Sequence, residues 1–153
     1  MSRSTLAAVL LLSAATCTAV LATAQTAAAA PPEEARLAGC DFGTIAGTYD
    51  YANFGEHAGK MLDITTGAFR AEFEDARPAI QANAAASHVH ATVDSVDCRI
   101  VSGDEARADV TVDVVRTTTS DETGGMPKTI KMSLLCTVEN VNGRWLVNRA
   151  ETK

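Results

Sequence analysis

The spacing of apolar residues changes once along the chain, and this change is the feature that most constrains the fold. Between residues 33 and 86, apolar side chains recur at steps of three and four, which is the spacing of one helical face. After Ser87 they recur at every second residue, which is the spacing of a strand with one buried face. Helices followed by a run of strands predict an α+β fold, with the helices packed on an antiparallel sheet.

Three helices are predicted in the first half. Their apolar faces carry Ala38, Phe42, Ile45 and Tyr49, then Phe54, Ala58, Met61 and Leu62, then Phe69, Phe73, Ala76, Ile80 and Ala84. Pro78 lies inside the third helix and removes a backbone donor, so we expect a kink or a break there. Gly39, Gly43 and Gly47 form a second row on the first helix, which predicts that this helix lies close against a sheet or another helix.

Four strands are predicted in the second half, joined as a meander. The first follows His88, and its apolar phase shifts near Asp94 and Ser95, which predicts a β-bulge. The second is marked by valines from 110 to 114, and we expect a polar loop from residue 117 to residue 125. The third runs from Ile130 to Val138. A hairpin turn at residues 142–143 leads into the fourth strand, which begins at Trp145.

The first 24 residues are typical of a segment that directs a chain out of the cytoplasm. Arg3 precedes an uncharged, mostly apolar stretch from residue 6 to residue 24. Ala22 and Ala24 form the pattern that signal peptidase cleaves, but the whole stretch is also long enough to cross a bilayer as a helix. We therefore expect residues 1–24 to be a signal peptide or a signal anchor, with membrane contact through residues 6–24 if the segment is not cleaved.

The rest of the chain is expected to be a short tether, residues 25–34, and one domain, residues 35–153. The tether is made of small residues and ends near a Pro-Pro pair. The formal net charge is −6 and no basic stripe is visible, which argues against a nucleic-acid partner. Either fate of the leader places the domain outside the cytoplasm, in or on the cell envelope.

Three cysteines lie beyond the leader: Cys40, Cys98 and Cys136. An oxidising compartment favours one disulfide and one free thiol among them. Cys98 and Cys136 fall on the first and third strands of the meander, which are about 10 Å apart, too far for a disulfide. We therefore expect a disulfide from Cys40 to one of the other two, with the partner left open. No CxxC pair is present, so a zinc site is not expected.

Several short motifs occur in an order that resembles one known family. They are Thr48-Tyr49-Asp50-Tyr51 after the first helix, Phe69-Arg70-Ala71-Glu72-Phe73, four strands, and the closing Asn142-Gly143-Arg144-Trp145-Leu146-Val147. Between residues 36 and 150 the chain resembles the Mce-associated membrane proteins of actinobacteria. The resemblance implies an NTF2-like, or SnoaL-like, cone, in which N-terminal helices pack on a curved four-stranded antiparallel sheet.

The same resemblance implies a function. Members of this family accompany Mce-type lipid and sterol import systems, so we expect a non-catalytic accessory protein whose partners are Mce transport subunits. Whether it acts at the inner or the outer membrane is left open. The alternative is an extracytoplasmic carrier or small enzyme that binds a lipid or steroid in an apolar cone.

The candidate contact residues for a partner or ligand are Tyr49, Asp50, Tyr51 and His57. Enzymes of NTF2-like fold need acids or histidines on inward strand positions, whereas the inward sets here, around Val110–Val114 and Ile130–Val138, carry no charge. We expect no catalytic residues, cofactor or metal. His88 and His90 are predicted to share one strand face with Asp94, but that face points to solvent and offers no fourth ligand.

Overall fold

The computed structural model describes residues 29–153. It contains three helices and a five-stranded antiparallel sheet with strand order β1-β2-β3-β4-β5. The predicted leader, residues 1–24, lies outside the described residues. None of the helices within residues 29–153 is both long enough and apolar enough to cross a membrane.

The helices are α1 (Glu33–Gly47), α2 (Phe54–Asp63) and α3 (Gly67–Ala86). All three occur where the apolar spacing predicts them, and α1 begins inside the expected tether. α1 ends before Tyr49, which belongs to a strand and not to the helical face that we expected it to share. α3 is one continuous helix with Pro78 inside it, so the chain does not break there.

The strands are β1 (Tyr49–Asp50), β2 (His90–Gly103), β3 (Arg107–Thr119), β4 (Lys128–Val141) and β5 (Arg144–Thr152). Residues 29–153 also contain two short 3-10 helices, η1 (Tyr51–Asn53) and η2 (Asp121–Thr123). The fold is therefore α+β as predicted, but the sheet has five strands and not four. The additional strand, β1, is two residues long, and alternation cannot be recognised in so short a segment.

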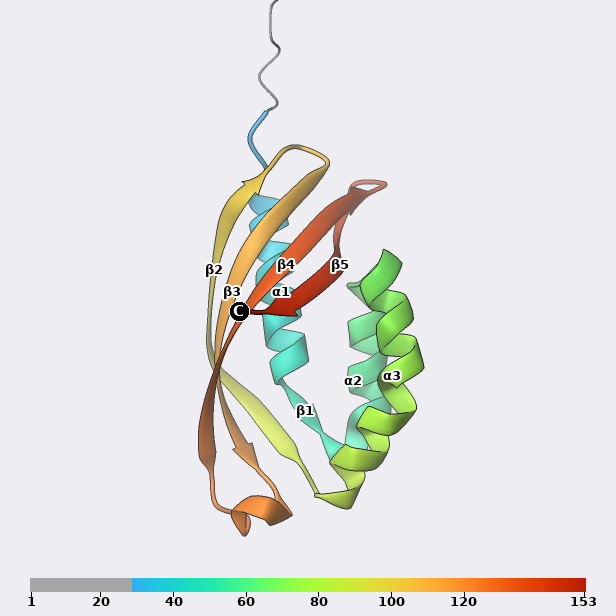
Figure 1. Cartoon of the computed structure of the whole chain (residues 1–153), viewed down its shortest axis with the longest axis vertical. Coiled ribbons are helices and arrows are strands. Elements are labelled where there is room, and N and C mark those ends of the chain that lie inside the picture. The colour runs from blue at the N-terminus through green and yellow to red at the C-terminus, as the bar shows by residue number, and fades with distance from the viewer. Residues whose placement is uncertain (1–28) are drawn as a thin grey trace, which may run out of the picture.

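The sheet is curved, and α1 lies in its concave side (Figure 1). α1 packs chiefly on β2 and β3, while α2 and α3 lie beyond it and α3 rests on β5. The predicted glycine row makes the close contact with the sheet. A Cβ atom built on Gly39 would lie 2.7 Å from Cγ1 of Val110, and one on Gly47 would lie 2.5 Å from Cγ2 of Val93.

The core lies between α1 and the concave face of the sheet. Its fully buried side chains include Phe54, Val110, Val112, Val114, Cys136, Val138 and Val147. The segment between α2 and α3 attaches these helices to β5, since Thr65 pairs with Val147 in an isolated parallel bridge. The Thr66 amide donates to the Val147 carbonyl at 2.9 Å, and the Val147 amide donates to the Ile64 carbonyl at 2.9 Å.

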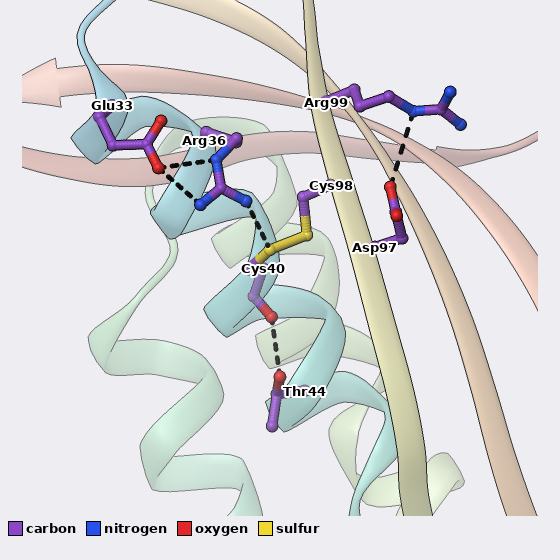
Figure 2. The surroundings of a disulfide bond; sticks show 7 residues. All are labelled: Glu33, Arg36, Cys40, Thr44, Asp97, Cys98 and Arg99. Atoms are coloured by element: carbon purple, nitrogen blue, oxygen red, sulfur yellow. Dashed lines mark hydrogen bonds and ion pairs between the residues drawn. A yellow bond between two sulfur atoms is a disulfide. The ribbon is translucent and has the colours of Figure 1, made fainter.

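A disulfide joins α1 to β2 between Cys40 and Cys98, whose Cα atoms lie 5.7 Å apart (Figure 2). The prediction of a disulfide from Cys40 is confirmed, and its partner is Cys98. Cys136 is a buried free thiol on β4, separated from β2 by β3, as the strand order requires. The Arg36 guanidinium, which is paired with Glu33, lies 3.7 Å from the Cys40 sulfur.

Candidate functional site

A surface hollow of about 310 Å³ brings together most of the predicted contact residues. We call it the β1 hollow because it lies where the end of α1, strand β1, helix α2 and the start of β2 meet. Its walls are formed by Thr44, Ile45, Thr48, Tyr49, Asp50, Asn53, Glu56, His57, Lys60, His90, Ala91 and Thr92. Tyr49, Asp50 and His57, three of the four candidate contact residues, therefore lie together. Tyr51 does not join them, because its ring packs edge-on against His88 at 4.9 Å.

His57 is a partly buried titratable group of the β1 hollow. Its ring centroid lies 5.4 Å from that of Tyr49 and 5.3 Å from that of Phe54. Burial lowers its pKa below the usual 6.5, a shift that the Thr48 hydrogen bond opposes and the Lys60 charge reinforces. Nδ1 lies 3.1 Å from the Thr48 carbonyl oxygen, which can only accept, so Nδ1 carries the proton. The neutral ring then has Nε2 as its free acceptor.

The charged groups around His57 are satisfied by one another. Asp50 accepts from the Ala52 amide at 2.8 Å, and its second oxygen lies 3.2 Å from Nδ1 of His90. Lys60 pairs with Glu56 at 2.7 Å. The Asp50–His90 contact joins β1 to β2, whereas the Glu56–Lys60 pair lies within α2, and His57 Nε2 is left as an acceptor. Such a hollow can accept a hydrogen bond from a ligand or partner, and its carboxylate–imidazole pair, Asp50 with His90, is exposed to solvent.

His90, Glu56 and Lys60 are members of the β1 hollow that sequence reasoning missed. His90 reaches it because β1 pairs with β2 in the register Asp50 opposite His90. That pairing joins residues 40 positions apart in the sequence. No local pattern in a two-residue strand could have revealed it.

The prediction that His88 shares a strand face with His90 and Asp94 is wrong, because β2 begins at His90. His88 precedes β2 with a positive φ of 48°, and its Nδ1 lies 2.6 Å from the Asp121 carboxylate. His90 faces Asp50, while Asp94 accepts from the Thr117 hydroxyl at 2.9 Å. Because His88 has a left-handed backbone conformation, the alternation of β2 does not extend to it. The imidazoles of His88 and His90 therefore contact different partners. Within residues 29–153, no three His, Cys, Asp or Glu side chains are grouped as a metal ion would require.

The acidic residues of β3 lie on the outer face of the sheet, as the alternation predicts. Asp109 accepts from the Thr137 hydroxyl at 2.8 Å and from the Ser102 hydroxyl at 3.0 Å. Asp113 accepts from the Ser133 hydroxyl and lies 3.4 Å from the Arg99 guanidinium. The opposite, concave face of the same strand carries buried Val110, Val112 and Val114.

The concave face nevertheless carries a polar pair that sequence reasoning missed. We expected a loop from residue 117, but β3 continues to Thr119, so Arg116 and Thr118 extend the inward set of Val110, Val112 and Val114. The Arg116 guanidinium carbon lies 6.0 Å from the centre of the Tyr49 ring. Continuing the two-residue period beyond Val114 would have identified both residues. The expectation of an uncharged inner face therefore holds only as far as Val114.

Cys136 is the remaining chemically distinctive side chain on the concave face. Burial raises the pKa of its thiol to about 12. The thiol therefore stays protonated at neutral pH and is a poor nucleophile.

No protein-family model matches this sequence, and no curated protein matches it significantly. Similarity is found among solved structures. The crystal structure of an IcmL-like type IV secretion system protein from Legionella pneumophila has a TM-score of 0.58 at 11% identity, covering 80% of this chain and 94% of that chain. The intermembrane space region of the chloroplast protein ARC6 has a TM-score of 0.46 at 16% identity, covering 78% and 92%. The first likeness shows a shared fold and nothing about partners.

Proposed function

We propose that this chain is a non-catalytic accessory protein of the cell envelope, with an NTF2-like cone, that docks on an Mce-type lipid or sterol import system. The observation that carries the non-catalytic part is the division of side chains between the two faces of β3. Valines fill the concave face beneath α1, whereas Asp109 and Asp113 lie on the outer face in hydrogen bonds to serine and threonine. Acid-base chemistry in a cone needs carboxylates or histidines on the concave side.

The location outside the cytoplasm rests on the leader-like sequence and on the disulfide. Disulfides persist in oxidising compartments and are rare in the cytosol. The disulfide between Cys40 and Cys98 is consistent with that location. It ties α1, the element nearest to the leader in sequence, to the second strand of the sheet.

The choice of partner rests on the resemblance to Mce-associated proteins. An accessory module needs a rigid surface more than it needs a reactive site. The groups lining the β1 hollow fit this role, since Asp50 contacts His90 and Glu56 is paired with Lys60 within the domain. The rival function is a carrier or small enzyme that holds a lipid or steroid in an apolar cone, and in the enzyme Tyr49, Asp50 or His57 would act on the bound molecule.

The decisive experiment is a pull-down of the full chain, tagged after the exposed Lys153, from gently solubilised native membranes. Near-stoichiometric recovery of Mce transport subunits supports the proposal, and recovery of the protein alone contradicts it. A variant carrying Asp50→Ala and His57→Ala is the matched comparison. An import activity lost in this variant at an unchanged yield of the partners would favour the carrier or enzyme.

A further inference from the structure

One edge of the sheet carries a long strand that is free along most of its length. Within residues 29–153, β1 pairs with the outer side of β2 only at positions 90–91, and the Val93 amide beyond them donates to the Thr48 hydroxyl at 3.4 Å. The opposite edge strand, β5, is bridged at Val147 by the segment between α2 and α3. The outer side of β2 after Val93 therefore presents backbone donors and acceptors that are available to a further strand.

The free edge has one regular stretch, residues 95–100. It lies between two irregularities in the pairing of β2 with β3, one just before residue 95 and one just after residue 100. Val96, Cys98 and Ile100 face the concave side and pack on the core. Figure 2 shows Asp97 and Arg99 on the other side of β2, away from the disulfide. A strand added here would therefore meet an apolar inner row and a charged outer row.

The charges of the outer row are unevenly matched. Asp97 lies directly opposite Asp113 in the pairing of β2 with β3. Both carboxylates contact the same cation, since the Arg99 guanidinium lies 3.6 Å from Asp97 and 3.4 Å from Asp113. Like charges directly opposite each other on a sheet are destabilising. A second cation on the free side of Asp97 would offset this repulsion.

We propose that the free edge of β2 pairs, antiparallel, with the same edge of a second copy of this chain. When the two Cys98 residues lie opposite each other, Asp97 of each copy lies opposite Arg99 of the other. Val96 then lies opposite Ile100 of the second copy, so the apolar inner row continues across the pairing. The second copy supplies a cation to each Asp97 and partners to the free backbone groups. This pairing goes beyond the docking role and does not depend on it.

The charges select this arrangement over its neighbours. In a symmetric pair of identical strands, moving the centre from Cys98 to Asp97 places two aspartates opposite each other, and moving it to Arg99 places two arginines opposite each other. Like charges that meet in this way are a common means by which an edge strand avoids pairing with its own copies. Of the three arrangements, the one centred on Cys98 alone brings opposite charges together, and it does so twice.

The test compares charge variants of the full chain, each purified with two different tags. Asp97→Arg should weaken self-association by about tenfold or more, because attraction becomes repulsion at both contacts. Arg99→Asp should have the same effect, since carboxylates then occupy both positions. Mixing the two variants restores opposite charges at both contacts, so they should bind each other as tightly as natural copies do. The affinity is obtained from the recovery of the second tag over a dilution series.

Two further variants separate pairing from net charge and from folding. Asp75→Arg makes the same change in net charge at an exposed position of α3, which packs on β5 at the opposite edge of the sheet, and it should leave self-association unchanged. The double variant Asp97→Arg, Arg99→Asp exchanges the two charges and should self-associate like the natural chain.

Three results would overturn the proposal. They are a natural chain whose differently tagged copies are not recovered together, equal self-association of the natural chain and Asp97→Arg, and failure of the mixed single variants to bind each other. None of them bears on whether the chain docks on a transport complex.

Discussion

A Cβ atom placed on Gly43 would lie 2.5 Å from Cγ1 of Val112, a separation that real Cβ atoms do not adopt. Helix α1 therefore approaches strand β3 more closely than any side chain would permit. Gly39 and Gly47 repeat the contact one turn away on either side, against Val110 and Val93. The glycine row allows the backbone of α1 to lie directly on the sheet, so the valines of β3 pack against the backbone of the helix.

Gly43→Ala should destabilise the domain. The added methyl group must displace Val112 inside a filled core, and overpacking of this kind costs about 1–3 kcal/mol. The gain in helix propensity, about 1 kcal/mol, offsets part of that cost. Urea unfolding should show a lower midpoint with an unchanged slope.

Gly59→Ala is the matched control for that measurement. Gly59 lies inside α2, and a Cβ atom there would meet nothing within 4 Å. This substitution should raise the free energy of unfolding by about 0.5–1 kcal/mol, because alanine loses less backbone entropy than glycine. Equal effects of the two substitutions would show that α1 is not held against β3 in this way.

Loss of the disulfide should lower the stability of the domain. Cys40 and Cys98 are separated by 58 positions, and closing a loop of that length stabilises a fold by about 2–4 kcal/mol. The variant Cys40→Ser, Cys98→Ser should unfold at lower urea concentration and should no longer respond to reducing agent. Non-reducing peptide mapping of the natural chain should recover a peptide pair linked through Cys40 and Cys98. A link through Cys136 would contradict the structure.

The features predicted correctly from the sequence are those that a fixed spacing determines. The row of Gly39, Gly43 and Gly47 repeats at the helical step, and in a helix that step places all three on one face. The bulge in β2 is also found, with the register shifting between Val93 and Ser95, because a change of phase in a two-residue period has no other simple cause. Exclusion of a disulfide between Cys98 and Cys136 follows from strand order alone.

The features that could not be predicted depend on partners distant in sequence. β1 exists because Tyr49 and Asp50 pair with Ala91 and His90, and two residues show no period by themselves. The positive φ of His88 likewise follows from the turn that joins α3 to β2 and from the contact with Asp121. Arg116 was missed for a different reason, since the threonines that follow it resemble a loop while extending the hairpin of β3 and β4.

The stability of the domain should depend on pH through His57. Burial lowers its pKa in the folded state, so below about pH 6.5 the unfolded chain binds a proton that the folded chain resists. The contribution of neutral His57 is therefore fully present above that pH and is lost as the pH falls through the window between 6.5 and the folded pKa. Urea unfolding at mildly acidic and mildly alkaline pH should show this loss.

His57→Phe supplies the comparison for the pH dependence. Phenylalanine keeps an aromatic ring among Tyr49 and Phe54 but cannot be protonated. The difference in unfolding free energy between the two pH values should be smaller in this variant than in the natural chain. An NMR titration in which His57 protonates at or above 6.5 would contradict the assigned environment.

Cys136 should react with thiol reagents only when the domain unfolds. Its thiol is fully buried on β4 and burial raises its pKa to about 12, so the reactive thiolate is scarce in the folded state. Because the folded pKa lies above the usual 9.0, the contribution of this thiol to stability is fully present below pH 9.0 and is lost as the pH rises toward the folded pKa.

Labelling by N-ethylmaleimide near neutral pH, in a chain carrying Cys17→Ser, should be slow without denaturant and should accelerate in parallel with urea unfolding. Cys136→Ala should abolish the labelling under non-reducing conditions. Rapid, complete labelling of the folded chain would mean that the concave face opens at β4, which a core built on Val110, Val112 and Val138 does not permit.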